Sequence, residues 1–309
     1  MRAFVIALLV TAALAACSRS IHQKDFATPE EAAQALVTAA RSGDAHALLE
    51  VLGAEAEPMV DSGDPVQDRN GRERFVRAYE TDHSLGTRVD GVMTLQVGAD
   101  AWPFPYPLIQ SDGRWLFDSS RGDEEIVNRR VGANELSTIQ SCLAFVDAER
   151  EYYVRNPQRD PLFQYAHKLL STEGKKDGLY WPTTGNETPS PVGERFARAR
   201  SEGYFAEGSG AGGPFRGYIY QLLTAQGASA SGGARDYLVG GKLLGGFALI
   251  AFPAEYGSSG VMSFIVNQDG VVYSKDLGPR TTAIARAIKT FDPDESWRRE
   301  AAIEQRAAR

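Results

Sequence analysis

A long stretch without proline constrains the fold of this chain more than any other feature of its sequence. It runs from Asp123 to the pair Asn156-Pro157. Apolar residues recur along it at spacings of three, four or seven, at Leu136, Ile139, Leu143, Val146 and Tyr153. This spacing predicts one long helix with an apolar stripe, and Pro157 ends it because the residue before a proline avoids helical backbone. The rest of the chain has to cover that stripe.

Helix signals also precede this stretch. Thr28, Pro29 and Glu31 occupy the N-cap, first and third positions of a capping box, and the helix that follows ends at Gly43. Asp44 caps a second helix that ends at Gly53, and a third helical stretch covers residues 73–79.

Strand signals replace the helix signals after residue 88. Alternating apolar residues from Val89 to Val97 predict a strand, and residues 108–117 form a hairpin around Asp112-Gly113. The prolines at 103, 105 and 107 cannot donate ladder hydrogen bonds, which predicts an extended edge segment.

The sequence after the long helix predicts an antiparallel meander. Strands are expected at residues 215–223, 237–239, 247–252, 261–266 and 271–273. The segment 247–252 is apolar on both faces and should be a central strand, not an edge strand. Two helices complete the prediction: a short one from Leu162 to Leu170, and one from Thr281 to Ile288 with Ile284 and Ile288 facing inward.

These elements predict an α+β fold in two parts. The chain of 309 residues has 43% hydrophobic residues, which suffices for packed cores and excludes wholesale disorder. We expect a linker at 17–26, an N-terminal domain at 27–122, a C-terminal domain at 123–297 and a polar tail at 298–309.

The first 16 residues predict export. Their apolar run, from Ala3 to Leu14, is too short to span the roughly 30 Å hydrocarbon core of a bilayer. Its end, Leu14-Ala15-Ala16-Cys17, resembles the lipobox of bacterial lipoproteins, which implies cleavage before Cys17 and acylation of its thiol. Ser18 in place of aspartate then implies an outer membrane lipoprotein facing the periplasm. The alternative is an ordinary secretory signal and a soluble periplasmic protein.

Two fold resemblances follow from the pattern of elements. Helices followed by a curved antiparallel sheet in the first part resemble the cone-shaped domain of nuclear transport factor 2. A long helix, a loop-rich stretch and a meander in the second part resemble the globular head of type IV pilins and pseudopilins. A pilin helix, however, begins with a membrane segment at the mature N-terminus, whereas here another domain precedes the helix.

Short sequence words point to one family. They include Phe104-Pro105-Tyr106-Pro107, Asp177-Gly178-Leu179-Tyr180-Trp181-Pro182, Gly232-Gly233-Ala234-Arg235-Asp236-Tyr237 and Pro253-Ala254-Glu255-Tyr256-Gly257. Together they resemble an uncharacterised Gram-negative envelope family, domain of unknown function 2950, from about Ala27 to Trp297. The resemblance implies a location in the envelope and brings no catalytic residues.

Composition and motifs argue against several functions. The formal charge is −7, and no basic run could follow a phosphate backbone, so we expect no nucleic acid partner. The glycine-rich run 208–213 satisfies G-x-G-x-x-G but precedes Pro214 and a strand, which favours a surface loop. Ser229 and Ser231 lack the flanking glycines of a nucleophile elbow.

The histidines and the second cysteine suggest no metal or thiol chemistry. His22, His46, His83 and His167 form no ligand pair with metal-site spacing, so the sequence predicts no metal and no cofactor. Cys142 lies next to Leu143 of the apolar stripe and is better interpreted as a small core residue than as a nucleophile.

Aromatic residues in loops are the remaining candidates for a ligand or partner surface. Tyr180 and Trp181 lie in a loop bounded by glycine and proline, and Glu255 and Tyr256 precede Gly257. The alternative is that these rings pack their loops onto the sheet. We expect a non-enzymatic, lipid-anchored binding or assembly module. The alternative is a cell-wall hydrolase that uses carboxylates the sequence cannot pair.

Overall fold

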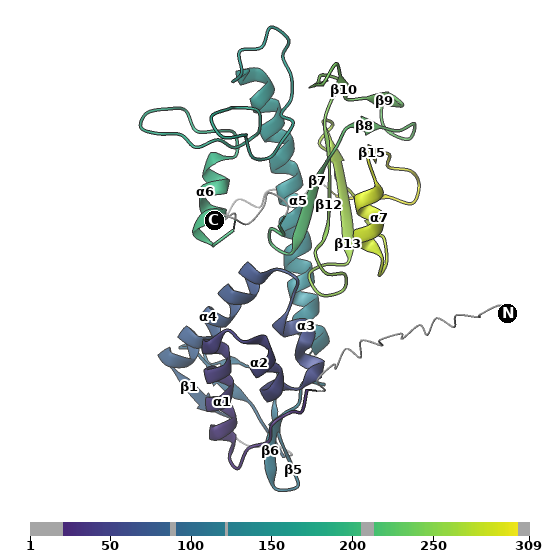
Figure 1. Cartoon of the computed structure of the whole chain (residues 1–309). Helices are drawn as coiled ribbons and strands as arrows, with labels where there is room; N and C mark the ends of the chain where they lie inside the picture. The colour runs from purple at the N-terminus through teal and green to yellow at the C-terminus, as the bar shows by residue number, and fades with distance from the viewer. Residues whose placement is uncertain (1–20, 87–90, 121–122, 205–212, 302–309) are drawn as a thin grey trace, which may run out of the picture.

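The computed structural model describes residues 21–86, 91–120, 123–204 and 213–301, and the structural statements below refer to these residues (Figure 1). The expected leader at 1–16, Cys17 and residues 208–212 of the glycine-rich run lie outside them. The helices are α1 (Pro29–Ser42), α2 (Ala45–Leu52), the 3₁₀ turn η1 (Ala54–Ala56), α3 (Glu57–Val60), α4 (Pro65–Thr81), α5 (Asp123–Arg155), α6 (Gly193–Ser201) and α7 (Thr281–Ala287).

The N-terminal helices form where the local signals predict them. The Thr28 hydroxyl accepts a hydrogen bond from the Glu31 N–H at 3.1 Å, and the Glu31 carboxylate returns one to the Ala27 N–H. Gly43 ends α1 in the left-handed conformation at φ 74°, which costs a residue without a side chain little. Asp44 caps α2. The third helix, α4, is longer than the predicted segment because Asp64 caps it from Pro65 onward.

Short strands complete the N-terminal part. They are β1 (His83–Leu85), β2 (Val92–Met93), β3 (Leu95–Val97), β4 (Trp102–Pro103), β5 (Leu108–Ser111) and β6 (Arg114–Phe117). They form two antiparallel sheets, β1-β3-β4 and β2-β5-β6, and β4 with its proline is an edge strand, as predicted. The predicted hairpin at 108–117 is confirmed. Buried apolar side chains of α1, α2 and these strands form one hydrophobic cluster.

The strands after α5 form a larger sheet. They are β7 (Tyr218–Leu223), β8 (Ala225–Gln226), β9 (Arg235–Asp236), β10 (Leu238–Val239), β11 (Lys242–Leu243), β12 (Ala248–Pro253), β13 (Met262–Asn267), β14 (Tyr273–Asp276), β15 (Thr290–Phe291) and β16 (Arg298–Arg299). The main sheet is antiparallel in the order β16-β14-β13-β12-β7, with small sheets β15-β8-β9 and β10-β11 beside it. No sheet among the described residues takes strands from both sides of α5.

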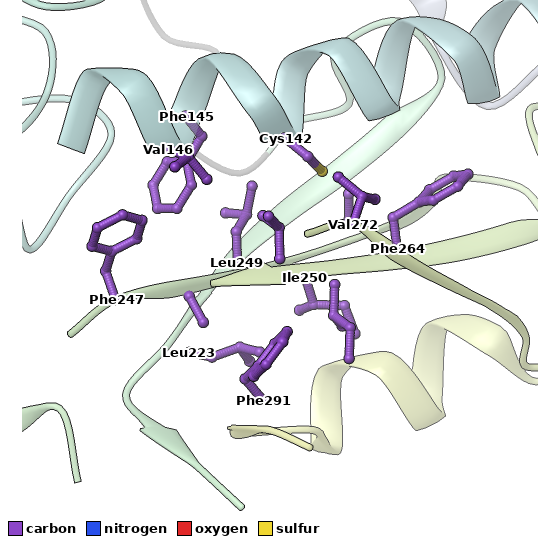
Figure 2. Close-up of a cluster of buried hydrophobic side chains, with 14 of the residues drawn as sticks. Cys142, Phe145, Val146, Leu223, Phe247, Leu249, Ile250, Phe264, Val272 and Phe291 are labelled. Carbon is purple, nitrogen blue, oxygen red and sulfur yellow. The ribbon is translucent and has the colours of Figure 1, made fainter. Parts of the chain in front are cut away.

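Both faces of the main sheet are covered. Figure 2 shows α5 over one face, with Cys142, Phe145 and Val146 directed at the strands, and α7 below the other face. Leu249 and Ile250 are successive residues of β12 and so face opposite sides of the sheet, yet both are at most 1% exposed. The prediction that this segment is a central strand is confirmed, since β12 pairs with β13 on one side and β7 on the other.

Helix α5 spans the predicted length, but its buried face differs from the predicted stripe. Leu136 is 49% exposed and Tyr153 is 36% exposed, whereas Asn134, Thr138 and Glu149 are buried. The prediction failed because these polar side chains make hydrogen bonds that offset part of the cost of burial, although only one of the two Glu149 carboxylate oxygens has a partner among the described residues. The Asn134 amide, for example, donates to the Ser259 carbonyl at 2.9 Å.

Three further predictions need correction. Residues 162–170 form no helix, because the Tyr165 N–H donates to the Leu243 carbonyl and the Ala166 N–H to the Glu149 carboxylate, instead of to carbonyls four residues earlier. In α7 Ile284 is 37% exposed, and Thr281 and Ala285 are buried instead. The expected tail at 298–309 begins with β16, which pairs with β14.

Polar contacts join the N-terminal part, before α5, to segments that follow α5 in the chain. Arg130, near the start of α5, donates to the Ser258 carbonyl at 3.0 Å and to the Pro58 carbonyl. Asp64, which is fully buried, accepts from the Tyr204 hydroxyl at 2.9 Å and from the Gly217 N–H at 2.8 Å. These contacts hold the N-terminal helices against the segment that follows α6 and against the turn after β12.

Candidate functional site

A pocket of about 490 Å³ lies between α5, α6 and the β7 side of the main sheet. Figure 1 shows α6 on the side of α5 away from α7. The pocket volume falls within the range of small-molecule binding sites, about 300–1,000 Å³. Five segments line the pocket: one face of α5, α6 itself, the loop before α6, the chain from residue 213 into β7, and β12 through Leu249.

Helix α5 supplies a wall of small and polar side chains. Ser137, Gln140, Ser141 and Ala144 line the pocket, and their spacing of three or four residues places them on one helix face. The Ser141 hydroxyl donates to the Ser137 carbonyl at 2.9 Å, so its proton is already used within the helix. This wall therefore offers a ligand a shaped surface and hydroxyl oxygens that can accept hydrogen bonds.

Helix α6 supplies the opposite wall and is amphipathic. Phe196 and Ala199 are buried, whereas Arg195 and Arg198 are exposed and line the mouth of the pocket. The ring of Tyr180 stacks on Phe196 at 3.7 Å between centroids and 27° between planes. This stacking fixes α6 against the preceding loop.

The C-terminal end of α6 is also fixed. Tyr204 packs edge-on against Phe215 at 5.0 Å between ring centroids, and its hydroxyl bonds to Asp64. The Asn70 amide donates to the Glu202 carbonyl at 2.9 Å. With both ends of α6 attached, the pocket wall is a built part of the fold.

Charges at the pocket are mainly positive. Arg195, Arg198 and Arg216 line it with one acid, Glu194. Arg216 is paired with Glu202, at 3.0 and 3.3 Å from the two carboxylate oxygens. Within the described part of the chain, no carboxylate pairs with Arg195 or Arg198. Two arginines at the mouth thus keep uncompensated charges.

The hydroxyl of Tyr220 lies in the floor of the pocket. It is buried without a hydrogen bond of good geometry, although the Thr138 and Ser141 hydroxyls adjoin it. Those two hydroxyls donate to helix carbonyls instead. Burial raises the pKa of Tyr220 above its ordinary value, so the phenol keeps its proton. It is a buried hydrogen-bond donor beside the polar face of α5.

The structure separates the two pairs of residues singled out from the sequence. Trp181 is 5% exposed, and its ring packs against Tyr152 at 6.3 Å between centroids, near the C-terminal end of α5. Tyr180 supports the pocket through Phe196. Neither ring lines the pocket, although Leu179, the residue before them, does.

Glu255 and Tyr256 lie in a turn near the other end of α5. The turn is closed by the Glu255 carbonyl, which accepts from the Ser259 N–H at 2.9 Å, and it contacts the N-terminal part through Ser258. Glu255 is exposed, and the Tyr256 hydroxyl reaches Asp276 at 3.2 Å. This turn does not line the pocket. The four residues therefore form no common surface.

Sequence reasoning missed the pocket because its walls come from segments far apart in the chain. A partial signal existed: residues 193–201, Gly-Glu-Arg-Phe-Ala-Arg-Ala-Arg-Ser, combine two arginines three apart with an apolar face. The helix signal in that region was obscured by the prolines at 182, 189 and 191.

Other candidates have structural roles. Cys142 is fully buried, and burial raises the pKa of its thiol to about 12, as expected for a core residue. His83 stacks on Tyr79 at 3.8 Å between ring centroids, and His167 contacts Gln164. Among the described residues, no three His, Cys, Asp or Glu side chains gather closely enough to hold a metal ion.

Comparison with known proteins identifies the family. The fold defines an α+β protein with a long helix packed on an antiparallel sheet and a pocket beside that helix. Residues 23–300 match the model of the family described as protein of unknown function (DUF2950), and the chain belongs to this family. No curated protein and no solved structure matches the chain. The resemblances to a pilin head and to nuclear transport factor 2 are unconfirmed.

In the stretches that the structure describes, no helix has the length and apolar character needed to cross a bilayer.

Proposed function

We propose that this protein is a lipid-anchored, non-enzymatic binding module of the cell envelope. The pocket between α5, α6 and β7 is the observation that supports binding, because it combines apolar walls with a few polar groups at its floor and mouth. The lipid anchor and the envelope location are supported by the lipobox-like residues Leu14 to Cys17 at the end of a short apolar run.

The anchor is tested by the mass of the protein in the membrane fraction. We expect an intact mass that corresponds to cleavage before Cys17 with acyl chains attached. Cys17→Ser should give an uncleaved or unlipidated chain. Recovery of a soluble, unmodified mature protein from unaltered cells would contradict the proposed anchor.

Binding in the pocket is tested by a variant that fills it. Ala144 is half-buried and lines the pocket from α5, so Ala144→Trp places a large ring in the cavity. Ala197→Trp is the matched control, because Ala197 is exposed on α6 and does not line the pocket. Native mass spectrometry of the full chain should show a small molecule that is lost in Ala144→Trp and kept in Ala197→Trp.

The opposite results would reject the proposal. If the unaltered chain carries no small molecule, or if Ala144→Trp retains the same bound species as Ala197→Trp, the pocket is not a binding site. Circular dichroism of both variants should match the unaltered protein, which separates loss of binding from loss of folding.

A further inference from the structure

We infer that the ligand of this pocket is an amphiphile with an apolar body and a single anionic group, and that Arg195 and Arg198 bind the anion. The inference rests on the proposed binding function and names the chemical class of its ligand. Two features of the described residues carry it: the apolar walls of the pocket, and the two unpaired arginines at its mouth.

The walls select an apolar body. Phe145 and Phe196 are at most 9% exposed, and Leu179 and Leu249 at most 1%; all four line the pocket. These side chains offer no hydrogen bonds. Against these four side chains a polar body would lose its bonds to water without replacement, whereas an acyl chain or an aromatic body would lose none. The polar side chains of the lining are confined to one face of α5, to the charged residues of α6, and to the chain from residue 213 into β7.

The arginines select an anion. Arg195 and Arg198 are three residues apart on α6 and both line the pocket, while Arg200 is exposed on the same helix and does not. A guanidinium group binds a carboxylate or a phosphate through two parallel hydrogen bonds. Both long side chains can also cover an apolar ligand with their methylene groups while their charged ends stay in water.

The charge of the whole protein strengthens this reasoning. The formal net charge is −7, so the molecule as a whole does not attract anions. Two arginines without a carboxylate partner at one pocket mouth are therefore a local exception. A cationic amphiphile would be repelled by the two guanidinium groups, and a neutral amphiphile would leave both of them without a negatively charged partner.

Displacement of a fluorescent probe tests the inference. The full chain carrying Cys17→Ser, which has no acyl group of its own, is titrated with 8-anilinonaphthalene-1-sulfonate. The probe is then displaced by dodecanoate, dodecyl phosphate, dodecanol or dodecyltrimethylammonium, each below its micelle concentration. The first two compounds distinguish a carboxylate from a phosphate head, and the last two are neutral and cationic controls. The Ala144→Trp variant supplies the blank for binding outside the pocket.

We expect the two anions to displace the probe at concentrations about tenfold lower than dodecanol, since a charge-assisted hydrogen bond is worth about one factor of ten or more. The double variant Arg195→Ala, Arg198→Ala should abolish this advantage. Arg200→Ala, its matched control, should keep it.

Two results would overturn the inference. The arginines do not select the head group if dodecanol and dodecanoate displace the probe equally well. The same conclusion follows if the double variant keeps the preference for anions. If dodecanol binds the unaltered chain at least as tightly as the anions and fails to bind Ala144→Trp, the proposed binding function stands and only the ligand class is wrong. If no compound displaces the probe, the ligand class is rejected, and the mass measurement of the preceding section decides the binding function separately.

Discussion

Replacing Asp64 by alanine is expected to destabilise the protein by about 3–7 kcal/mol. The side chain is fully buried and accepts four hydrogen bonds. Two come from Val66 and Gln67 at the start of α4, both at 3.1 Å, and two come from Tyr204 and Gly217, which follow α6 in the chain.

The magnitude follows from the donors that alanine would leave without a partner. Loss of an N-cap costs about 1 kcal/mol. Each buried donor left unpaired, here the Tyr204 hydroxyl and the Gly217 N–H, costs about 1–3 kcal/mol. Asp64→Asn should cost less than Asp64→Ala, because the amide oxygen can still cap α4. It should still cost some stability, because the NH₂ group would face the Gly217 N–H and both are donors.

Asp44→Ala is the matched control. Asp44 caps α2 through the His46 and Ala47 N–H groups but is exposed, and its side chain has no contact beyond that helix turn. Its loss should cost about 1 kcal/mol. The free energy of unfolding is measured by equilibrium urea denaturation followed by tryptophan fluorescence. If Asp64→Ala lowers the free energy of unfolding no more than Asp44→Ala does, the hydrogen bonds from Tyr204 and Gly217 to Asp64 contribute nothing, and the reasoning is refuted.

Three further outcomes are expected. Burial raises the pKa of Glu149 well above 4.5, so the folded protein binds this proton more tightly than the unfolded chain does. The protonated carboxyl group therefore contributes its full stabilisation at acid pH, and this contribution is lost as the pH rises through the folded-state pKa. Urea denaturation at several pH values from about 5 to 8 should show the free energy of unfolding falling in the unaltered chain and not in Glu149→Gln. Cys142, with a thiol pKa raised to about 12, should react with Ellman's reagent at pH 8 only after denaturation, in the chain carrying Cys17→Ser; fast reaction of the folded protein would contradict its burial. Trp181→Ala should cost about 3–5 kcal/mol in the same urea assay, because the ring is core; an unchanged free energy of unfolding would favour a surface role.

Local sequence signals predicted the elements that depend on neighbouring residues. The capping box at Thr28, the glycine that ends α1 and the proline that ends α5 all act within one helical turn, and each element boundary agrees with the structure. The hairpin around Asp112-Gly113 is equally local, because both residues adopt the positive φ that such a turn requires.

Predictions failed where distant partners decide which side of a helix is buried. Hydropathy placed Leu136 on the inner face of α5, but Asn134 takes that place through its bonds to Ser259 and Gln67. A predicted helix at 162–170 is absent for the same reason, since its N–H groups have tertiary acceptors. Hydropathy and periodicity contain no information on such partners.

Local patterns were sufficient to predict the α+β class, the long helix, a central strand at 247–252 and the family. These follow from periodicity, caps and short words, all of which act over a few residues. Only the tertiary structure decided that α6 stands opposite α5 and that Arg195, Arg198 and Arg216 share one pocket. That arrangement depends on contacts such as Tyr204 with Asp64, 140 residues apart, and a hydrogen bond between buried groups so distant exists only once the whole chain has packed.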